Sequence, residues 1–502
     1  MSENLQTAVI PQTPRLETPL EPHLGRAQMA HGFAWTAAFS VLSKVVFPLG
    51  GLYVARTLGP AILGIAALLQ MTLSLSEVLR EAGLTQTFLT EQALSPEVDA
   101  AYVGASFGGG LFTALGVLAL TPFLTGFFKQ PELSWSLPFV SLCLLMNAVG
   151  TIPNARMLRN AAFKNQGSIA VIASAVALVV AVVLVASGVR FPALVAQFTL
   201  GSAINLFFSL RREPIRKVSF DLAIIRPIAQ RSRALVGANI LNNLFLFCDV
   251  FVLQKMVGTV TAGVYNATQV IAYKPADLIL FPMIKTVMVA FGRSSGDPVK
   301  LSDSYWRVLT AVVLLIAPLY AFIATNADGI IMLLLARQFA GGIPILEVLS
   351  LYLVCRTIGS TSGVALVPAG KHYWTFYPWV LALAVTISGV WMNATHPTTM
   401  GIVWSFTAGA VVVYSTIFMI AIYFIRPSER MTTRFLKALV ITAGTSLIAL
   451  AIHLSPLQMY ARLFISLAFL PIIQLALSGY VFERDWRIYL SYSGVKKLWH
   501  AL

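Results

Sequence analysis

Long apolar stretches, each about 20 residues in length, follow one another along the chain with short polar segments between them. A helix needs about 20 mainly apolar residues to cross the hydrocarbon core of a bilayer, so each stretch predicts a membrane-spanning helix. The gaps between these stretches are too short for a folded extramembrane domain. The expected fold class is therefore an all-α polytopic membrane protein. The sequence predicts fourteen spans, at residues 33–54, 61–79, 100–127, 134–152, 168–189, 191–210, 235–257, 261–290, 304–324, 345–366, 373–391, 400–424, 435–453 and 459–481.

The composition agrees with a bilayer as the solvent. Apolar residues make up 57% of the chain and charged residues only 11%, whereas a soluble domain carries about 25% charged residues. This composition argues against a soluble enzyme, a nucleic-acid-binding protein and a disordered scaffold. Residues 1–32 are polar and rich in proline and lack an apolar core, so they predict a disordered cytoplasmic tail and not a cleaved signal peptide.

The basic residues are distributed unevenly between the two sides of the predicted membrane. The formal net charge is +15. With the amino terminus placed inside, 26 of the 35 Lys and Arg residues fall in cytoplasmic segments and six fall in outer loops. This bias follows the positive-inside rule, so both termini are expected in the cytoplasm.

The longest inner segment, residues 211–234, carries seven basic residues and divides the predicted spans into groups. We expect six spans before it (33–210, the N-lobe) and six after it (235–424, the C-lobe). Two further spans lie in 425–482, and a cytoplasmic tail is expected at 483–502. The basic segment is interpreted either as a topology anchor that rests on anionic lipid headgroups or as a docking site for a partner protein.

A weak internal repeat supports this division. A shift of 199 residues superposes residues 52–70 on residues 251–269, and both segments cover the predicted outer turn between the first two helices of a lobe. Parallel repeats of this kind are typical of transporters whose substrate path lies at the repeat interface. The matched pairs are Gly59 with Gly258, Gly64 with Gly263, Gln70 with Gln269 and Arg56 with Lys255.

The sequence lacks the common signatures of catalysis. It contains no G-x-G-x-x-G pattern, and its six histidines do not pair at metal-ligand spacing. We therefore expect no enzyme activity, no catalytic residue, no cofactor and no metal site. Without such a site, an ion gradient or the gradient of the substrate itself must drive any transport. The spacing of Gly104 and Gly108 predicts close packing between helices.

Polar residues inside the predicted spans are the candidates for function, because ionised groups are costly there and tend to face an aqueous cavity. The mid-span cations outnumber the acids slightly, so we expect a polar, slightly cationic lumen that favours an anionic substrate. The candidates for substrate binding are Lys44, Lys274, Arg356, Asn242, Asn243 and Tyr352, and those for ion coupling or gating are Asp249, Asp277 and Glu77.

Several of these candidates admit two interpretations. Arg356 has no acidic residue within one helical turn, so its guanidinium needs an anion from elsewhere, either Asp249 or a substrate phosphate. Lys274 and Asp277 flank Pro275, which predicts a bent segment whose charged pair either gates the path or only stabilises the helix.

The first two spans carry charges of their own. Lys44 lies near the middle of its span, where it either lines the lumen or forms a structural ion pair. Glu77 and Arg80 are three residues apart and are predicted to pair on one helix, at the inner mouth of the path.

Two segments of the chain resemble a known family. The segment from Ala55 to Pro60, followed by Gly64, resembles the "AR-x-LGP-x-x-x-G" turn of bacterial polysaccharide and oligosaccharide flippases. The segment from Asp249 to Tyr265 is similar to the counterpart of this turn in their second half. The nearest members are the Wzx-type flippases of the multidrug/oligosaccharidyl-lipid/polysaccharide (MOP) exporter superfamily, and the resemblance covers essentially the whole chain.

The resemblance implies two six-helix lobes around a lumen, with the last two helices outside them. It implies a multi-pass protein of the bacterial cytoplasmic membrane that moves undecaprenyl-pyrophosphate-linked repeat units to the outer leaflet for O-antigen or exopolysaccharide biosynthesis. Alternating access, coupled to a proton or sodium gradient, would drive this transport. Lys44, Lys274 and Arg356 occupy suitable positions for lumen cations. The implied partners are the lipid-linked oligosaccharide, membrane lipids, and the polysaccharide polymerase and chain-length machinery; no nucleic acid is involved.

Three alternatives remain at this stage. A drug exporter of the same superfamily would share the fold, but a cationic drug would favour a lumen dominated by carboxylates. A lipid II flippase would have the same number of helices and a cationic cavity. A membrane-embedded polysaccharide polymerase or ligase would need a long outer loop with catalytic groups, and the predicted outer loops are short.

Overall fold

The computed structural model describes residues 26–81, 83–91, 94–160, 162–293 and 297–481. Side chains are described in these ranges except at 26–49, 231–244, 278–290 and a few single positions. All regular elements of the described residues are helical. They are α1 (Arg26–Glu81), α2 (Leu84–Thr90), α3 (Pro96–Phe128), α4 (Glu132–Arg159), α5 (Phe163–Ala186), α6 (Phe191–Arg212), α7 (Leu222–Met256), α8 (Thr259–Arg293), α9 (Pro298–Thr325), α10 (Ala327–Leu334), α11 (Ile343–Leu366), α12 (Phe376–Met392), α13 (Thr399–Phe424), α14 (Glu429–His453) and α15 (Met459–Val481), with short 3₁₀ turns at Arg337–Gly342 and His372–Thr375.

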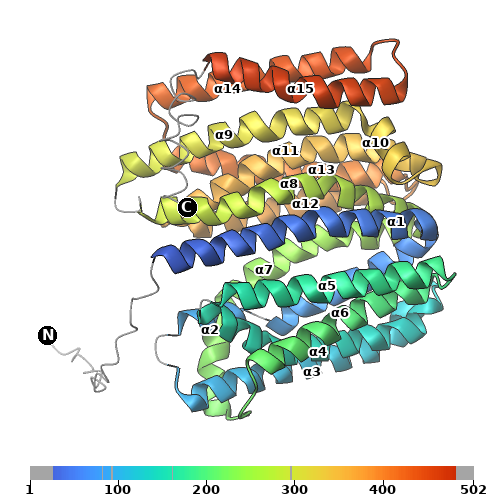
Figure 1. The fold of residues 1–502 in the computed structure, drawn as a ribbon, viewed down its shortest axis with the longest axis vertical. Coiled ribbons are helices and arrows are strands. Elements are labelled where there is room, and N and C mark those ends of the chain that lie inside the picture. Colours follow the sequence, from blue (N-terminus) through green and yellow to red (C-terminus); the bar gives the residue numbers. More distant parts are fainter. Residues whose placement is uncertain (1–25, 82, 92–93, 161, 294–296, 482–502) are drawn as a thin grey trace, which may run out of the picture.

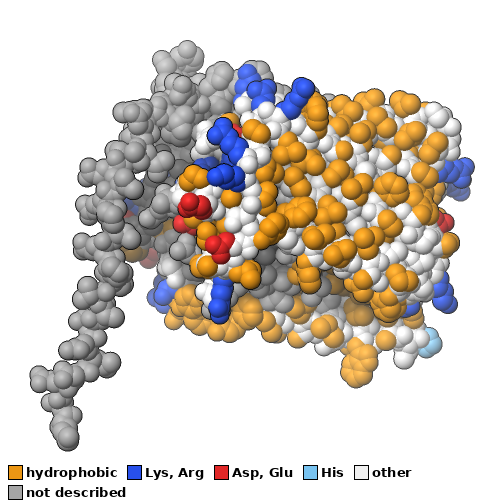
Figure 2. Space-filling view, turned by 90° about the horizontal axis from the view of Figure 1, so that it is seen from below, with side chains coloured by type: hydrophobic (Ala, Val, Ile, Leu, Met, Phe, Trp, Pro, Cys, Tyr) orange, Lys and Arg blue, Asp and Glu red, His pale blue; other side chains and the backbone are white. Residues whose placement is uncertain are grey.

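The fold class predicted from the apolar stretches is confirmed. Among the described residues, eleven helices are long and apolar enough to cross a membrane. The remaining three predicted spans, 33–54, 235–257 and 261–290, lie in helices whose side chains are only partly described, so the total of fourteen stays a prediction. Hydrophobic side chains cover the middle of the face shown in Figure 2, and charged side chains gather toward its two ends.

The long helices run alongside one another (Figure 1). Helices α3 to α6 form one group and α9 with α11 to α15 form another, while α1, α7 and α8 lie between them. α1 packs extensively against α8, and α14 and α15 pack on α9 at the edge of the second group. In the following, the N-half denotes α1 to α6 and the C-half denotes α7 to α13.

Two glycine turns mark one end of the bundle, here named the glycine end. α1 changes direction at Gly59, whose φ is 78°, and the turn between α7 and α8 contains Gly258 with φ 129°. Positive φ is readily adopted by glycine, which explains why both turns carry it. The opposite end, where residues 213–221 connect α6 to α7, is named the linker end. The structure thus places both repeat glycines in turns, as the repeat predicts.

The other pair of repeat glycines forms a reciprocal contact between α1 and α8. A Cβ added at Gly64 would lie 2.1 Å from the carbonyl oxygen of Thr259, and one added at Gly263 would lie 1.7 Å from that of Pro60. The shift of 199 residues that relates Gly64 to Gly263 also relates Pro60 to Thr259. The two helices therefore cross with pseudo-two-fold symmetry, at a distance that only glycine permits.

Three of the differences between the observed helices and the sequence prediction have a local physical cause. α1 begins at Arg26 and not at 33, because Ala27, Gln28 and their neighbours favour helix outside the bilayer as well. α7 begins at Leu222 and not at 235, because the Asp221 carboxylate accepts a hydrogen bond from the Ala223 amide at 2.8 Å and caps the helix there. α8 is helical throughout, so Pro275 does not interrupt it as expected. Neighbouring helices tolerate the single missing amide donor.

The predicted role of Gly104 and Gly108 in helix packing was wrong. An added Cβ at Gly104 would meet the carbonyl oxygen of Ser219 at 1.9 Å, and Ser219 belongs to the segment between α6 and α7. Nothing lies within 4 Å of a Cβ added at Gly108. The lack of a side chain at Gly104 therefore makes room for the segment between α6 and α7, and not for another helix.

Candidate functional site

A buried carboxylate of α7 is the centre of a hydrogen-bond network inside the C-half. Asp249 is 5% exposed. Its Oδ2 accepts hydrogen bonds from the Tyr265 hydroxyl at 2.7 Å and from Gln269 Nε2 at 2.9 Å, and its Oδ1 accepts one from the Val250 amide at 2.7 Å. All three donors are neutral groups. The carboxylate is therefore solvated by protein dipoles, and no ion pair with a described cation neutralises it.

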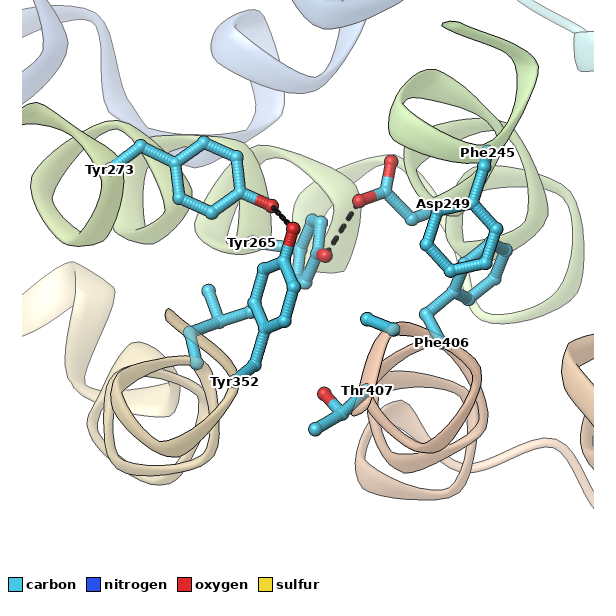
Figure 3. Close-up of a pocket in the computed structure, with 9 residues that line it drawn as sticks. Phe245, Asp249, Tyr265, Tyr273, Tyr352, Phe406 and Thr407 are labelled. Carbon is cyan, nitrogen blue, oxygen red and sulfur yellow. Dashed lines mark hydrogen bonds between the residues drawn. The ribbon is translucent and has the colours of Figure 1, made fainter. Parts of the chain in front are cut away.

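Tyrosines extend this network from α8 to α11. Gln269 also donates to the Tyr273 hydroxyl at 3.2 Å, and that hydroxyl bonds to the hydroxyl of Tyr352 at 3.4 Å. Tyr273 and Tyr352 project from α8 and α11 and meet edge to face (Figure 3). The network thus joins three helices of the C-half.

A small cavity lies beside these groups. Its volume is about 20 Å³, and it is lined by Phe245, Asp249, Tyr265, Tyr273, Leu349, Tyr352, Phe406, Thr407 and Ala410 (Figure 3). About 10–15 Å³ of such space holds one water molecule. The cavity can therefore hold a water molecule or a small cation next to the carboxylate, but not a sugar or a diphosphate.

The guanidinium of Arg356 lies at the other end of the network. Its central carbon stands 4.8 Å from the centroid of the Tyr273 ring, a cation–π geometry. Asp277 is the carboxylate whose charge acts on it. Nη1 of Arg356 is buried, and no acceptor among the described residues bonds to it. This arginine retains donor capacity that the described residues do not use.

The structure distinguishes the two interpretations of Arg356. Asp249 bonds to Tyr265 and Gln269, and no described ion pair joins it to Arg356. The proposed Asp249–Arg356 pair is therefore absent. Asp249 and Arg356 are instead connected through Gln269 and Tyr273, because Gln269 bonds to both Asp249 and Tyr273 and Arg356 lies over the Tyr273 ring.

The remaining C-half candidates are dispersed. Lys274 is exposed and Asp277 is partly buried, although they lie within one turn of α8. Tyr352 is 4% exposed and lines the small cavity. The side chains of Lys44, Asn242 and Asn243 lie outside the described residues.

In the N-half, two charged residues of α1 bind α4 side by side. Arg80, 5% exposed, donates from Nη1 to the Thr151 hydroxyl at 2.6 Å, and Asn147 donates to the carboxylate of Glu77. The Thr151 hydroxyl in turn donates to the carbonyl of Asn147 at 2.8 Å. The predicted Glu77–Arg80 ion pair is therefore not formed. Each charge bonds to a neutral partner on α4, because α4 packs against this face of α1.

Contacts at the glycine end join the two halves. Lys255, just before the C-half turn, donates to the carbonyl of Phe127 in α3 at 2.9 Å and lies 3.7 Å above its ring. Gln130, which follows α3, donates to the Thr259 hydroxyl at 2.9 Å. Both bonds run from one half to the other.

A matching pair of bonds joins the glycine turn of the N-half to residues of the C-half. Arg56, the repeat counterpart of Lys255, reaches the carbonyl of Leu333 at 3.4 Å, and Gln338 donates to the carbonyl of Arg56 at 2.6 Å. Each half thus offers one cation from its turn and one glutamine from a connection between later helices: Gln130 lies between α3 and α4, and Gln338 lies in the 3₁₀ turn between α10 and α11. We name the contacts of Arg56, Lys255, Gln130 and Gln338 the clasp.

Sequence reasoning identified Asp249, Tyr352 and Arg356 but not the residues that connect them. Tyr265 and Gln269 are the donors to the carboxylate, and Thr407 lines the cavity from α13 (Figure 3). Tyr265 and Gln269 share one face of α8 at a spacing of four residues, which was the available signal. Thr407 carries no signal, since its role depends on how α13 packs.

Comparison with known proteins gives a consistent result. A family model described as "Polysaccharide biosynthesis protein" matches residues 53–344. The succinoglycan biosynthesis transport protein ExoT of Rhizobium meliloti (strain 1021) is 24% identical over 67% of this chain and 68% of its own length. The lipopolysaccharide biosynthesis protein WzxC of Escherichia coli (strain K12) is 22% identical over 69% of this chain and 71% of its own length.

Solved structures show the same fold at low sequence identity. The lipid II flippase MurJ in an inward closed conformation superposes with a TM-score of 0.72 at 13% identity, over 89% of this chain and 99% of its own. A MOP superfamily transporter from Pyrococcus furiosus gives a TM-score of 0.54 at 14% identity, over 82% and 96%. Because the family model spans more than half of the chain, the chain belongs to the polysaccharide biosynthesis protein family and has the fold of MOP superfamily transporters.

Proposed function

We propose that this protein moves a polyprenyl-pyrophosphate-linked oligosaccharide across the bacterial cytoplasmic membrane for polysaccharide biosynthesis. The observation that carries the proposal is the family match together with two relatives that align over two thirds of the chain and are named for transport or biosynthesis of bacterial polysaccharides. A bundle of helices that cross a membrane suits transport between leaflets. We expect no enzymatic step.

The proposed path lies between the halves and not in the C-half cavity. A cavity of about 20 Å³ cannot hold a sugar, whereas parallel repeats place the substrate at their interface. In this proposal residues 33–210 and 235–424 are the two lobes, and 425–482 packs outside them. Arg356, with its unused donor, and Lys44 serve the pyrophosphate, because charge-assisted hydrogen bonds to anionic oxygens are strong.

The proposed orientation follows from the charges. The linker end carries the basic segment 211–234, so we place it and both termini in the cytoplasm, and the glycine end outside. The clasp and the reciprocal glycine contact then close the path on the outer side. In an alternating-access cycle these contacts separate when the path opens outward.

Asp249 is proposed to couple transport to an ion. A carboxylate solvated only by neutral donors, beside a cavity that holds a water molecule or a small cation, can exchange a proton or bind a sodium ion. Either ion would change the charge in the middle of the Tyr265–Tyr352 network. That network reaches α8, which contacts α1 of the other half at Gly263, so the ion site is mechanically connected to the interface.

Reconstitution in liposomes tests the proposal. The purified protein should transfer a fluorescent polyprenyl-pyrophosphate oligosaccharide between leaflets, measured by the loss of fluorescence to a membrane-impermeant reductant. Lipid II and a cationic drug serve as competing substrates that represent the two alternatives in the superfamily. Transfer of the drug without transfer of the lipid-linked sugar would contradict the proposed substrate class.

The orientation has its own test. In a background without the three native cysteines, Leu222→Cys should react with impermeant thiol reagents only from the cytoplasm, and Ser187→Cys only from outside. Both positions are exposed. Labelling of residue 222 in intact cells would reverse the orientation.

A further inference from the structure

The segment that joins the two halves combines exposed cations with exposed apolar side chains. We name Arg211–Leu222 the linker strip. Its four cations are all exposed, and three of its large apolar side chains are exposed as well, whereas Ile215 packs against the N-half. The cations are Arg211, Arg212, Arg216 and Lys217, and the exposed apolar residues are Val218 at 49%, Phe220 at 59% and Leu222 at 76% exposure.

The backbone of the strip is fixed against the N-half. The Ser219 amide donates to the carbonyl of Ala100 in α3 at 3.0 Å, and Gly104 provides the space for this approach. Arg156 of α4 donates to the carbonyl of Pro214 at 3.1 Å. The strip is therefore held in place, and its exposed side chains project from a defined position.

The depth of this position follows from the length of α3. A helix of 33 residues is about 50 Å long, and the hydrocarbon core is about 30 Å thick, so about 10 Å of helix extends beyond the core at each end. Ala100 lies four residues after the first residue of α3, about 6 Å along the helix. Ser219 is thus held at the level of the lipid headgroups.

The four cations of the strip outnumber its two carboxylates, Glu213 and Asp221. None of its four cations forms an ion pair with a described residue, and Asp221 is engaged in capping α7. Arg211 lies 5.1 Å from the ring centroid of Phe207, which is 54% exposed near the end of α6. An exposed aromatic ring below a cation is typical of a membrane interface.

We propose that the linker strip binds the headgroups of anionic phospholipids, with its apolar side chains dipping into the acyl boundary. Phospholipid is the occupant because the strip lies in the headgroup layer, where lipid surrounds the protein. Four exposed cations, followed along the strip by the exposed Val218, Phe220 and Leu222, match an anionic leaflet in both charge and polarity. Assignment to the cytoplasmic leaflet rests on the proposed orientation, whereas lipid binding itself does not depend on the transport function.

Lipid binding is measured on the full chain in neutral detergent. Native mass spectrometry compares retention of phosphatidylglycerol and phosphatidylcholine with identical acyl chains. Each basic residue near an anionic surface contributes a factor of about five, so Arg216→Gln with Lys217→Gln should weaken phosphatidylglycerol binding by about 25-fold. Retention of phosphatidylcholine should not change, and higher salt should reduce the preference for phosphatidylglycerol.

A matched control uses two exposed cations of α9. Lys300 and Arg307 each lie near a carboxylate, at 3.1 Å from Asp297 and 4.0 Å from Asp303. Neutralising both with glutamine should leave phosphatidylglycerol binding within a factor of two, because these charges are already compensated. Lys217→Gln alone, with an expected loss of about fivefold, serves if the double variant folds poorly.

Two results would overturn the proposal. One is equal retention of phosphatidylglycerol by the wild type and the strip variant. The other is displacement of phosphatidylglycerol by soluble glycerol phosphate or by an acidic peptide as effectively as by fresh lipid, which would identify a free anion or a protein as the ligand. Because the readout is binding, failure of the transport assay would leave this conclusion standing.

Discussion

The two halves are alike where they touch and unlike in their interiors. At the glycine end, each half contributes a glycine turn, a cation and a glutamine, and the contacts run reciprocally between them. One further remnant of the repeat lies outside this contact, since Gln70 bonds to Ser74 as Gln269 bonds to Tyr273, four residues on, although Gln70 is exposed and Gln269 is buried. The repeat has therefore preserved the mutual contact more strongly than the interior chemistry.

The two interiors use their charges differently. In the C-half, Asp249 stands beside a small cavity and is held by neutral donors. In the N-half, Glu77 and Arg80 both bond to neutral groups of α4. This contrast suggests a division of labour in which the C-half binds the ion and the N-half charges hold two helices together. The experiments below test this contrast and the shared contact.

The largest effect is expected where the two halves cross. Gly263→Ala places a Cβ 1.7 Å from a backbone carbonyl that cannot move without shifting α1, so α1 and α8 must separate. Overpacking of this kind costs about 1–3 kcal/mol or more. Thermal unfolding in detergent should show a clear loss of stability. Gly116→Ala in α3, where nothing lies within 4 Å, is the control and should not destabilise. Equal stability of the two variants would disprove the close crossing.

The next effect concerns the proposed ion site. Asp249→Asn keeps the size of the side chain and much of its hydrogen bonding but removes the charge. We expect transport to fall by about a hundredfold, equivalent to about 2.7 kcal/mol, with normal abundance in the membrane. Glu77→Gln is the counterpart in the N-half and should retain most of the transport. If both variants transport equally well per folded molecule, the division of labour is wrong.

Arg356 tests the anion-binding role. Arg356→Ala should reduce transport by about tenfold to a hundredfold, because a charge-assisted contact is worth about 1.5–3 kcal/mol. Arg356→Lys should recover part of it, since the charge remains but the planar fork is lost. Because Asp249 and Arg356 do not pair, combining Asp249→Ala with Arg356→Ala should not restore expression or transport. Restoration would show that the two residues do interact.

Arg80 should affect stability and not transport. Removing its guanidinium leaves the Thr151 hydroxyl without this donor. It also removes the positive charge that lies near the carboxylates of Glu77 and Glu81. We expect Arg80→Ala to lower stability by about 1–3 kcal/mol and to reduce membrane abundance. Transport per folded molecule should stay within a factor of about three. A selective loss of transport, measured at equal abundance, would move Arg80 into the substrate path.

The smallest effect is expected for the exposed cations of the clasp. Lys255→Gln or Arg56→Gln removes one bond at the surface, worth about 0.2–1 kcal/mol. The population of outward-open molecules should rise by up to about fivefold, as measured by thiol accessibility at the interface. The two variants should resemble each other, because the repeat relates these residues. A change in only one of them would show that the clasp is not symmetric in function.

Much of the fold could be predicted from the sequence, because membrane helices are encoded locally. Apolar runs located the helices, and the spacing of Gly59 and Gly258 located both turns. The positions of helix ends outside the bilayer were predicted less well. The Asp221 cap starts α7, and helix-forming residues after Arg26 extend α1, and neither effect leaves a trace in the hydrophobic pattern.

The site was only partly predictable, because periodicity shows the face of a helix but not its partner. Asp249, Tyr352 and Arg356 were recognised as polar residues in apolar surroundings. Their mutual arrangement depends on the rotation of α7, α8 and α11 about their axes, which the sequence of each helix does not determine. For the same reason Gly104 was assigned to helix packing, although it admits Ser219.

The central claim is that the substrate passes between the halves, which must separate at the glycine end. Cysteines that replace Gln130 and Thr259, whose side chains bond at 2.9 Å, can be joined by a short, reducible bifunctional thiol reagent in a background without native cysteines. Transfer of the lipid-linked oligosaccharide in liposomes should stop on cross-linking and return on reduction. Transfer at the same rate in the cross-linked protein would contradict the claim.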